Sequence, residues 1–281
     1  GEVTQVVNGQ GGEVDFPSLA DGFLEMEQGF EDYPTLIYDG PFSDHIQQQE
    51  PKLLAGLERI DEKQAMTRAA EFLVNAPVTP DGEIGGNLPC YQFSGDNRRI
   101  TISKQGGFVV EYIDSRSIQE ATLSIDQALA KAEEVLEDKG FEGFVMRYYN
   151  LNNGILTINY AYTEKDVVYY PDLLKIGIAM DNGQLVSLDA KGYIMNHTSR
   201  QLPQAKISME EAREKLSPHL TPKEGGRLTV IPSEGLREIV CYEFSCTGED
   251  EEQVLVYVNI ETGEEEQILI LLQDDTGVLA M

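Results

Sequence analysis

Carboxylates are the most numerous side chains in this sequence that could do chemistry. The 281 residues include 49 Asp plus Glu, against 21 Lys plus Arg and three His. Two carboxylates on either side of a glycosidic bond can hydrolyse it as acid and base, or as acid and nucleophile. Here the acids crowd into runs at 249–252, 264–266 and 274–275. With so many acids, pairs at catalytic spacing arise by chance. We therefore interpret the acidic runs as solvated loops and a charged sheet face, with incidental calcium binding as the alternative.

Histidine gives no pattern of metal ligands or of catalytic groups. None of His45, His197 and His219 has another His, or a Cys, at metal-ligand spacing. The sequence contains no Walker loop, Rossmann glycine fingerprint, Gly-x-Ser-x-Gly motif or His-Glu-x-x-His motif. We therefore predict that this chain is not an enzyme and that it has no catalytic residues, no metal and no cofactor.

Cysteine is also too scarce to support a disulfide framework. The three residues are Cys90, Cys241 and Cys246. Free Cys usually behaves as a small buried apolar residue, and this is the interpretation that we favour. A single disulfide is the alternative.

The net charge restricts the partners that this chain can bind. A formal charge of −28 disfavours nucleic acid, which is bound through clustered Lys and Arg, and disfavours anionic lipid for the same reason. The longest strictly aliphatic run, residues 268–272, is far shorter than the ~18 residues of a membrane-spanning helix. We expect no membrane contact by this stretch of sequence.

The helices that would position any functional side chain start with a pattern that occurs three times. Each start has an aliphatic residue, then Asp or Ser, then Gln or Glu three residues further on, then Ala. This spacing is a capping box, in which two side chains satisfy free N–H groups at a helix N-terminus. We expect the Ala to let the helix approach a sheet closely. The predicted N-caps are Asp61, Ser124 and Ser208, and the Ala residues are Ala65, Ala128 and Ala212.

Strand-like runs follow each predicted helix. Residues 90–94 and 241–245 both read Cys-Tyr-x-Phe-Ser, and residues 157–162 are a divergent middle copy. A Gly-containing turn between two short runs comes later in each case, and Asn182-Gly183 is the strongest hairpin signal among these turns. The predicted hairpins span residues 102–109, 178–185 and 258–265.

The repeated pattern predicts an α+β fold of three tandem units, each a helix packed on a three- to four-stranded antiparallel sheet. The predicted boundaries are an irregular N-terminal arm at 1–59, then units at 60–120, 121–205 and 206–281. Units this small are marginally stable alone, so we expect them to pack together and share cores.

Two segments are more specific than the repeats. Residues 33–45 read YPTLIYDGPFSDH, and residues 190–197 read AKGYIMNH. Both resemble the YpeB family of spore germination proteins, and the helix-plus-sheet units are similar to the PepSY domains that this family carries. The residues that we single out within the two segments are Tyr38, Asp39, Gly40, Pro41, Phe42 and His45, and Tyr193, Met195, Asn196 and His197.

The resemblance implies a function that the residues alone do not indicate. It implies a non-catalytic spore germination accessory protein that binds, stabilises and regulates SleB, a cortex-lytic transglycosylase of spore peptidoglycan. It also implies an extracytoplasmic location at the spore inner membrane and cortex, an N-terminal membrane anchor in the full-length protein, and proteolysis by a regulatory protease. A PepSY-type protease-inhibitory or chaperone-like module of the cell envelope is the alternative, acting by adding a strand to a sheet edge. Tyr38 to His45 is then a structural clasp, the interpretation that we favour, or a partner-docking surface. Gly192 to His197 is a short connector after the second sheet, which we favour, or likewise a partner-docking surface.

Overall fold

The computed structural model of this chain describes residues 50–280, apart from 75, 233–236, 249–251 and 275–276. These residues all belong to one compact unit, Leu36–Met281. Most of the predicted arm, and with it Tyr38, Asp39, Gly40, Pro41, Phe42 and His45, lies outside the described residues.

The predicted helices begin where the capping boxes place them. Helices α3 (Glu62–Phe72), α4 (Ile125–Lys139) and α6 (Met209–Glu214) each follow an Asp or Ser whose side chain accepts from the backbone of the Gln or Glu three residues later. The Gln or Glu side chain accepts from the N-cap backbone in return. The described residues also form two short helices, η1 (Lys52–Leu54) and α5 (Lys191–Asn196).

A second repeated contact explains the Gly in each predicted hairpin. The aliphatic residue before each N-cap donates its backbone N–H to a carbonyl of the hairpin: Ile60 to Lys104, Leu123 to Met180 and Ile207 to Ile260, at 2.8, 3.0 and 3.3 Å. The aliphatic side chains lie against Gly107, Gly183 and Gly263, where an added Cβ would come within 2.9, 3.4 and 3.1 Å of them. These Gly residues also have positive φ, so the hairpin both turns and approaches the helix start through the same residue.

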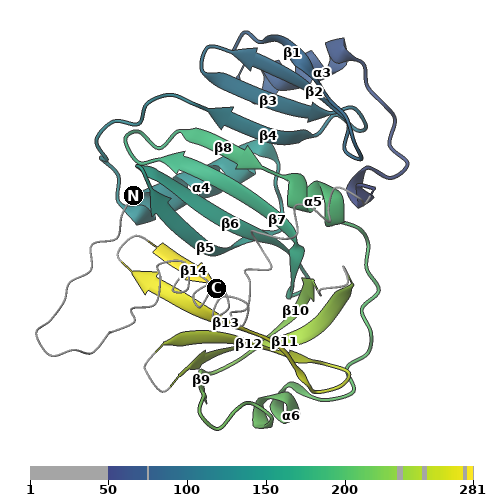
Figure 1. Cartoon of the computed structure of the whole chain (residues 1–281), viewed down its shortest axis with the longest axis vertical. Coiled ribbons are helices and arrows are strands. Elements are labelled where there is room, and N and C mark those ends of the chain that lie inside the picture. Colours follow the sequence, from purple (N-terminus) through teal and green to yellow (C-terminus); the bar gives the residue numbers. More distant parts are fainter. Residues whose placement is uncertain (1–49, 75, 233–236, 249–251, 275–276, 281) are drawn as a thin grey trace, which may run out of the picture. The chain divides into compact units, whose positions relative to one another are not determined.

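The strands form one continuous and mostly antiparallel sheet. Along the sheet their order is β1-β2-β3-β4-β8-β7-β10-β11-β12-β13-β14-β5-β6, and β9 pairs with β11 (Figure 1). The first eight strands are β1 (Thr79–Ile84), β2 (Cys90–Gly95), β3 (Arg98–Ser103), β4 (Val109–Asp114), β5 (Phe144–Asn152), β6 (Ile155–Glu164), β7 (Val167–Ala179) and β8 (Leu185–Asp189). The others are β9 (Thr221–Pro222), β10 (Arg227–Pro232), β11 (Glu238–Thr247), β12 (Gln253–Asn259), β13 (Glu265–Asp274) and β14 (Gly277–Ala280).

The α+β class is confirmed, with a difference in how the sheets are arranged. The sequence predicts a separate small sheet for each unit, whereas the structure joins these sheets edge to edge. Strand β4 pairs with β8, β10 runs parallel to β7, and β14 pairs with β5. Because β6 also pairs with β7, the strands from β7 through β10–β14 to β5 and β6 close into a ring. Joining the sheets satisfies the N–H and C=O groups that their edges would leave unpaired. The division of the chain into three units at the predicted boundaries stays a prediction.

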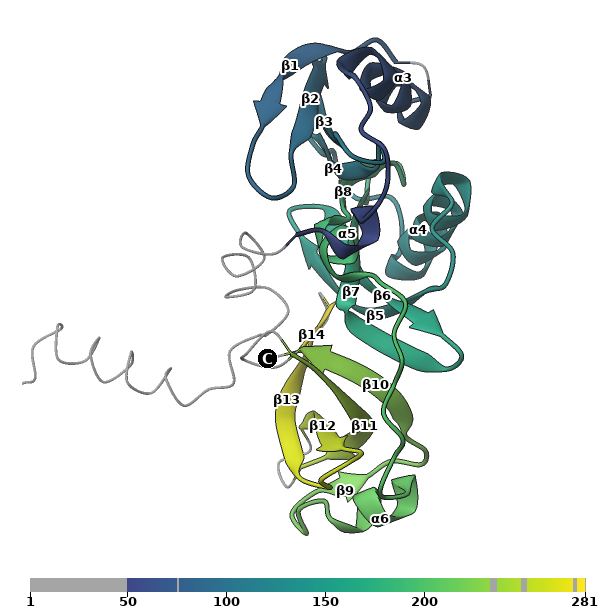
Figure 2. The same cartoon turned by 90° about the vertical axis from the view of Figure 1, so that its right-hand side faces the viewer.

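The helices cover one side of the sheet, where most of the core lies. Figure 2 shows α3 and α4 on the same side of the strands that they cover. Ala65, Ala128 and Ala212, the predicted small residues, are all completely buried between helix and sheet. A further cluster without a helix fills the opposite face and includes Val168, Tyr170, Leu173, Ile231 and Tyr257.

One buried carboxylate on this opposite face is paired. The carboxylate of Glu243, whose residue is 2% exposed, accepts hydrogen bonds from Arg147 at 3.1 Å and from the hydroxyl of Tyr170.

Cys90, Cys241 and Cys246 are free and buried, as predicted. Burial raises the pKa of the Cys90 and Cys241 thiols to about 12, so they stay protonated and inert at neutral pH. In the part of the chain that the structure describes, no helix is long and apolar enough to cross a membrane.

Candidate functional site

The family-like segment at 190–197 is a short helix packed on the long strand β7. Helix α5 begins where Asp189 accepts from the backbone N–H of Lys191 at 2.9 Å. Gly192 lies so close to β7 that an added Cβ would be 2.9 Å from the carbonyl oxygen of Leu173. Ile194 and Met195 are 1% exposed. The sequence predicts a short connector here, and the structure shows that this connector contains a helix packed on the sheet.

A fully buried carboxylate, Asp172, lies at the C-terminal end of this helix. It belongs to β7, and its Oδ2 is 2.7 Å from Nδ1 of His197. Arg200 donates to the same carboxylate through both terminal nitrogens, at 2.8 and 2.6 Å. A buried carboxylate needs a charged or hydrogen-bonding partner to offset the loss of water, and here it has two.

Arg200 extends the network to a second carboxylate. It donates to Glu238 of β11 at 2.8 and 2.7 Å, and Lys52 of η1 is 3.7 Å from Glu238. Burial opposes the charge of Arg200, but the hydrogen bonds to Glu238 and Asp172 outweigh it and raise the pKa of the guanidinium above its ordinary value. Burial likewise opposes the charge of Glu238, but Arg200 and Lys52 hold its pKa below the usual range. We call Asp172, Asn196, His197, Arg200 and Glu238 the Asp172 cluster.

The remaining polar group of α5 also bonds within the protein. The Asn196 side chain donates to the carbonyls of Pro171 and Gly192, each at 3.0 Å. The backbone carbonyl of Asn196 accepts from Arg200 at 3.0 Å. Asn196 therefore ties the helix end to β7 on one side and to Arg200 on the other.

Aromatic rings pack against the ring of His197. The centroid of its ring is 4.5 Å from that of Tyr193 and 4.6 Å from that of Tyr162. Phe144 packs edge-on against Tyr193 at 5.0 Å. Burial raises the pKa of both Tyr193 and Tyr162, so their hydroxyls are protonated at neutral pH.

This geometry is that of a structural junction. A His that is hydrogen-bonded to a buried carboxylate is how enzymes orient a general base. However, no hydroxyl or thiol among the described residues hydrogen-bonds to His197, and Arg200 donates to both oxygens of the carboxylate. The described residues also include no cluster of His, Cys, Asp or Glu that could hold a metal ion. The cluster instead joins η1, β7, α5 and β11.

Three members of this cluster are absent from the residues that the sequence singles out. Of the predicted residues, Tyr193, Asn196 and His197 meet around β7, whereas Met195 lines a pocket beside α5. Asp172, Arg200 and Glu238 were missed. A usable signal existed for Asp172, because it is the only acid in β7, a mostly apolar strand whose one other charged residue is Lys175.

This chain is similar to several known proteins. A family model described as YpeB sporulation, PepSY1 and PepSY2 domains matches residues 19–203. Sporulation protein YpeB of Halalkalibacterium halodurans is 29% identical over 89% of this chain and 58% of the relative. Sporulation protein YpeB of Oceanobacillus iheyensis is 27% identical with the same coverage. Sporulation protein YpeB of Bacillus subtilis is 28% identical over 60% of this chain and 38% of the relative.

A solved structure is also similar. The Bacillus megaterium YpeB C-terminal domain aligns with a TM-score of 0.69 and 26% identity, over 77% of this chain and all of that one. The chain spans little more than half the length of the first two curated relatives, 58% in each case.

Proposed function

The chain belongs to the YpeB family of sporulation proteins, and we propose that it is a non-catalytic accessory protein that binds, stabilises and regulates the cortex-lytic enzyme SleB. The match across residues 19–203, which includes both PepSY domains of the family model, is the observation that carries this proposal. We place the protein outside the cytoplasm, at the spore inner membrane and cortex.

The chemistry of the Asp172 cluster supports a binding role over a catalytic one. Its carboxylates and its His are engaged with Arg200, Lys52 and aromatic rings, and Asp172 has no exposed surface. Such a network fixes the relative positions of neighbouring elements, as a rigid binding scaffold requires. PepSY domains are likewise not typical catalytic domains.

The negative charge of the chain favours a partner whose binding surface is basic. A formal charge of −28 attracts a cationic partner over long range and speeds encounter at low ionic strength. We expect the complex with the lytic enzyme to weaken as salt is raised, since screening shortens the reach of these charges to about 10 Å at 0.1 M.

The test uses the purified chain and the SleB enzyme of the same organism. Binding is measured by calorimetry at low and high salt, and lysis of purified spore cortex is followed with and without the chain. We expect a saturable complex, a changed rate of cortex lysis and a longer lifetime of the enzyme under protease challenge. An unrelated protein of similar negative charge is the control. Absence of a complex, together with an unchanged rate and lifetime, would refute the proposal. A panel of cell-envelope peptidases in the same assay tests the protease-inhibitory alternative.

A further inference from the structure

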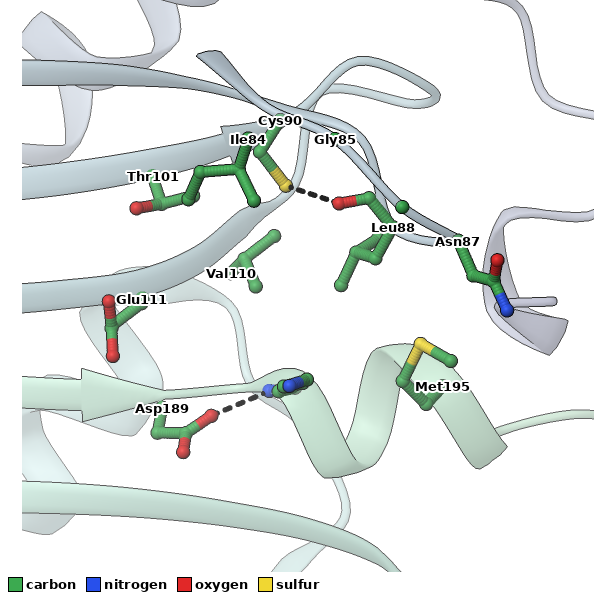
Figure 3. A pocket seen from close by; sticks show the side chains of 12 residues that line it. Ile84, Gly85, Asn87, Leu88, Cys90, Thr101, Val110, Glu111, Asp189 and Met195 are labelled. Atoms are coloured by element: carbon green, nitrogen blue, oxygen red, sulfur yellow. Dashed lines mark hydrogen bonds between the residues drawn. The ribbon is translucent and has the colours of Figure 1, made fainter. Parts of the chain in front are cut away.

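A pocket lies beside helix α5, on the face of the sheet away from α3. Its volume is about 480 Å³, within the range of small-molecule sites. It is bounded by β2, β3, β4 and the end of β8, by the end of β1 and the loop after it, and by α5 (Figure 3). The apolar part of its lining comes from Ile84, Leu88, Val110 and Met195.

The opposite side of the pocket is polar because three neighbouring strands align their polar residues there. Thr101 of β3 is paired with Glu111 of β4, and Glu111 is paired with Asp189 of β8. Residues directly opposite each other in antiparallel strands point to the same face. Figure 3 shows these three side chains along one side of the pocket, with Leu88 and Met195 along the other.

Glu111 is a half-buried carboxylate with no partner in the described part of the chain, since no side chain there forms a hydrogen bond or ion pair with it. Burial raises its pKa, and the nearby charge of Asp189 raises it further, against the smaller opposing influence of Lys191 and Arg99. Asp189 differs, because it accepts from the backbone N–H of Lys191.

Thr101 adds an independent sign of a missing ligand. The residue is 3% exposed, and its hydroxyl has no hydrogen-bond partner among the described residues. A buried hydroxyl without a partner is unfavourable, and native structures contain few of them. This hydroxyl can accept one hydrogen bond from a ligand and donate another.

We propose that this pocket binds the ammonium group of a small apolar amine, and specifically of an apolar amino acid or of a peptide N-terminal residue. The ammonium donates to Glu111 and to the hydroxyl of Thr101, and the apolar side chain packs on Leu88 and Met195. An ammonium group has three donors, which suits two converging oxygen acceptors. Lys191, which also lines the pocket, meets the carboxylate of a free amino acid.

The experiment is calorimetric titration of the whole chain with L-leucinamide, L-leucine and a leucyl dipeptide. Isocaproamide, which lacks the ammonium group, is the control ligand. We expect the amines to bind saturably, with dissociation constants below ~10 mM, and we expect no binding of isocaproamide. Tighter binding of leucine than of leucinamide identifies a free amino acid as the ligand, and tightest binding of the dipeptide identifies a peptide N-terminus. A ¹³C-methyl spectrum reports the location, since the Met195 methyl signal should shift on binding.

Variants separate a ligand role from a structural role. Glu111→Gln should weaken binding roughly tenfold or more, because a charge-assisted hydrogen bond is lost. Glu137→Gln removes the same charge from the exposed face of α4 and should change the affinity less than about twofold. Thr101→Val removes only a buried hydroxyl, so it should weaken binding while leaving the fold intact.

Three results would overturn the proposal. These are no binding of any amine, equal binding of isocaproamide, and an affinity that Glu111→Gln leaves unchanged. None of them bears on the complex with the lytic enzyme, so this proposal and the proposed function fail independently.

Discussion

Arg200 holds the buried carboxylate of Asp172 through two hydrogen bonds, of 2.8 and 2.6 Å. The same guanidinium reaches Glu238, and its carbon lies 4.9 Å from the centre of the Tyr169 ring. The planar guanidinium can satisfy two carboxylates and stack on an aromatic ring at the same time, which a lysine cannot do. One side chain thus links β7 to β11 across the intervening strand β10.

Replacing Asp172 by Ala should strongly destabilise the fold. It leaves Arg200, which is 7% exposed, with one carboxylate instead of two, and removes the partner of His197. Removal of one partner of a buried ion pair typically costs about 3–5 kcal/mol. Urea unfolding followed by circular dichroism measures the change. Glu134→Gln, which breaks the exposed pair with Lys131, is the control and should cost less than about 0.5 kcal/mol. Equal effects of the two changes would contradict a buried junction.

The pKa of Glu238 predicts how stability depends on pH. Its pKa is lowered in the folded protein, so the unfolded chain binds more protons in the interval between the two pKa values. The stabilisation is complete above the ordinary pKa of Glu and is lost as the pH falls through the folded value. The urea midpoint of Glu238→Gln should therefore fall less steeply with acidification than that of the parent. Glu133→Gln, which removes the same charge from the exposed face of α4, is the control variant.

Local features of the fold could be predicted from the sequence because they depend on neighbouring residues. Each capping box spans four positions, and each hairpin depends on one Gly, so Asp61, Ser124 and Ser208 could be assigned without the rest of the chain. The joining of the sheets depends on which edges meet, as where β4 pairs with β8. Nothing in the residues of an edge strand identifies its partner, so a single continuous sheet was not predicted.

In the candidate site, too, only the residues that are close together in the sequence could be predicted. Residues 190–197 could be singled out as a contiguous segment, although the structure makes them a helix. The bonds from Asp172 to His197 and Arg200 span 25 and 28 residues, and that from Arg200 to Glu238 spans 38. The pairing of an isolated acid with a distant Arg only becomes evident once the strands are aligned.

The small residue of each helix should be sensitive to size. Ala128 is completely buried where α4 contacts the sheet, whereas Ala130 lies on the exposed side of the same helix. Ala128→Leu should destabilise the protein by about 1–3 kcal/mol, since the added atoms have no space. Ala130→Leu should have little effect, because Leu is nearly as good a helix former as Ala. Thermal unfolding of the two variants provides the comparison, and similar melting temperatures would refute close packing of this face.

The close approach of α5 to β7 makes a similar prediction for Gly192. A Cβ at this position would be 2.9 Å from a backbone oxygen, which cannot move without shifting β7. Gly192→Ala should therefore cost about 1–3 kcal/mol in the free energy of unfolding. Gly85 has open space around its Cα and is the matched control. Gly85→Ala should be neutral or slightly stabilising, since Ala restricts the unfolded chain. A Gly192→Ala variant as stable as Gly85→Ala would mean that the helix is not held against the strand.

Glu111 should lower the stability of the unliganded protein at neutral pH. Its folded pKa is raised, so the native state binds more protons than the unfolded chain in the interval between the two pKa values, and stability falls as the pH rises through that interval. Among its neighbours, Asp189 adds to this effect, and Lys191 and Arg99 reduce it. Glu111→Gln should therefore be more stable than the parent at pH 7 and should lose this part of the pH dependence. Urea midpoints measured from about pH 4, near the ordinary pKa of Glu, up to neutral pH provide the comparison. A variant less stable than the parent at every pH would show that the carboxylate is already satisfied within the protein. Higher stability combined with weaker amine binding would show that the residue is retained for a ligand at the expense of stability.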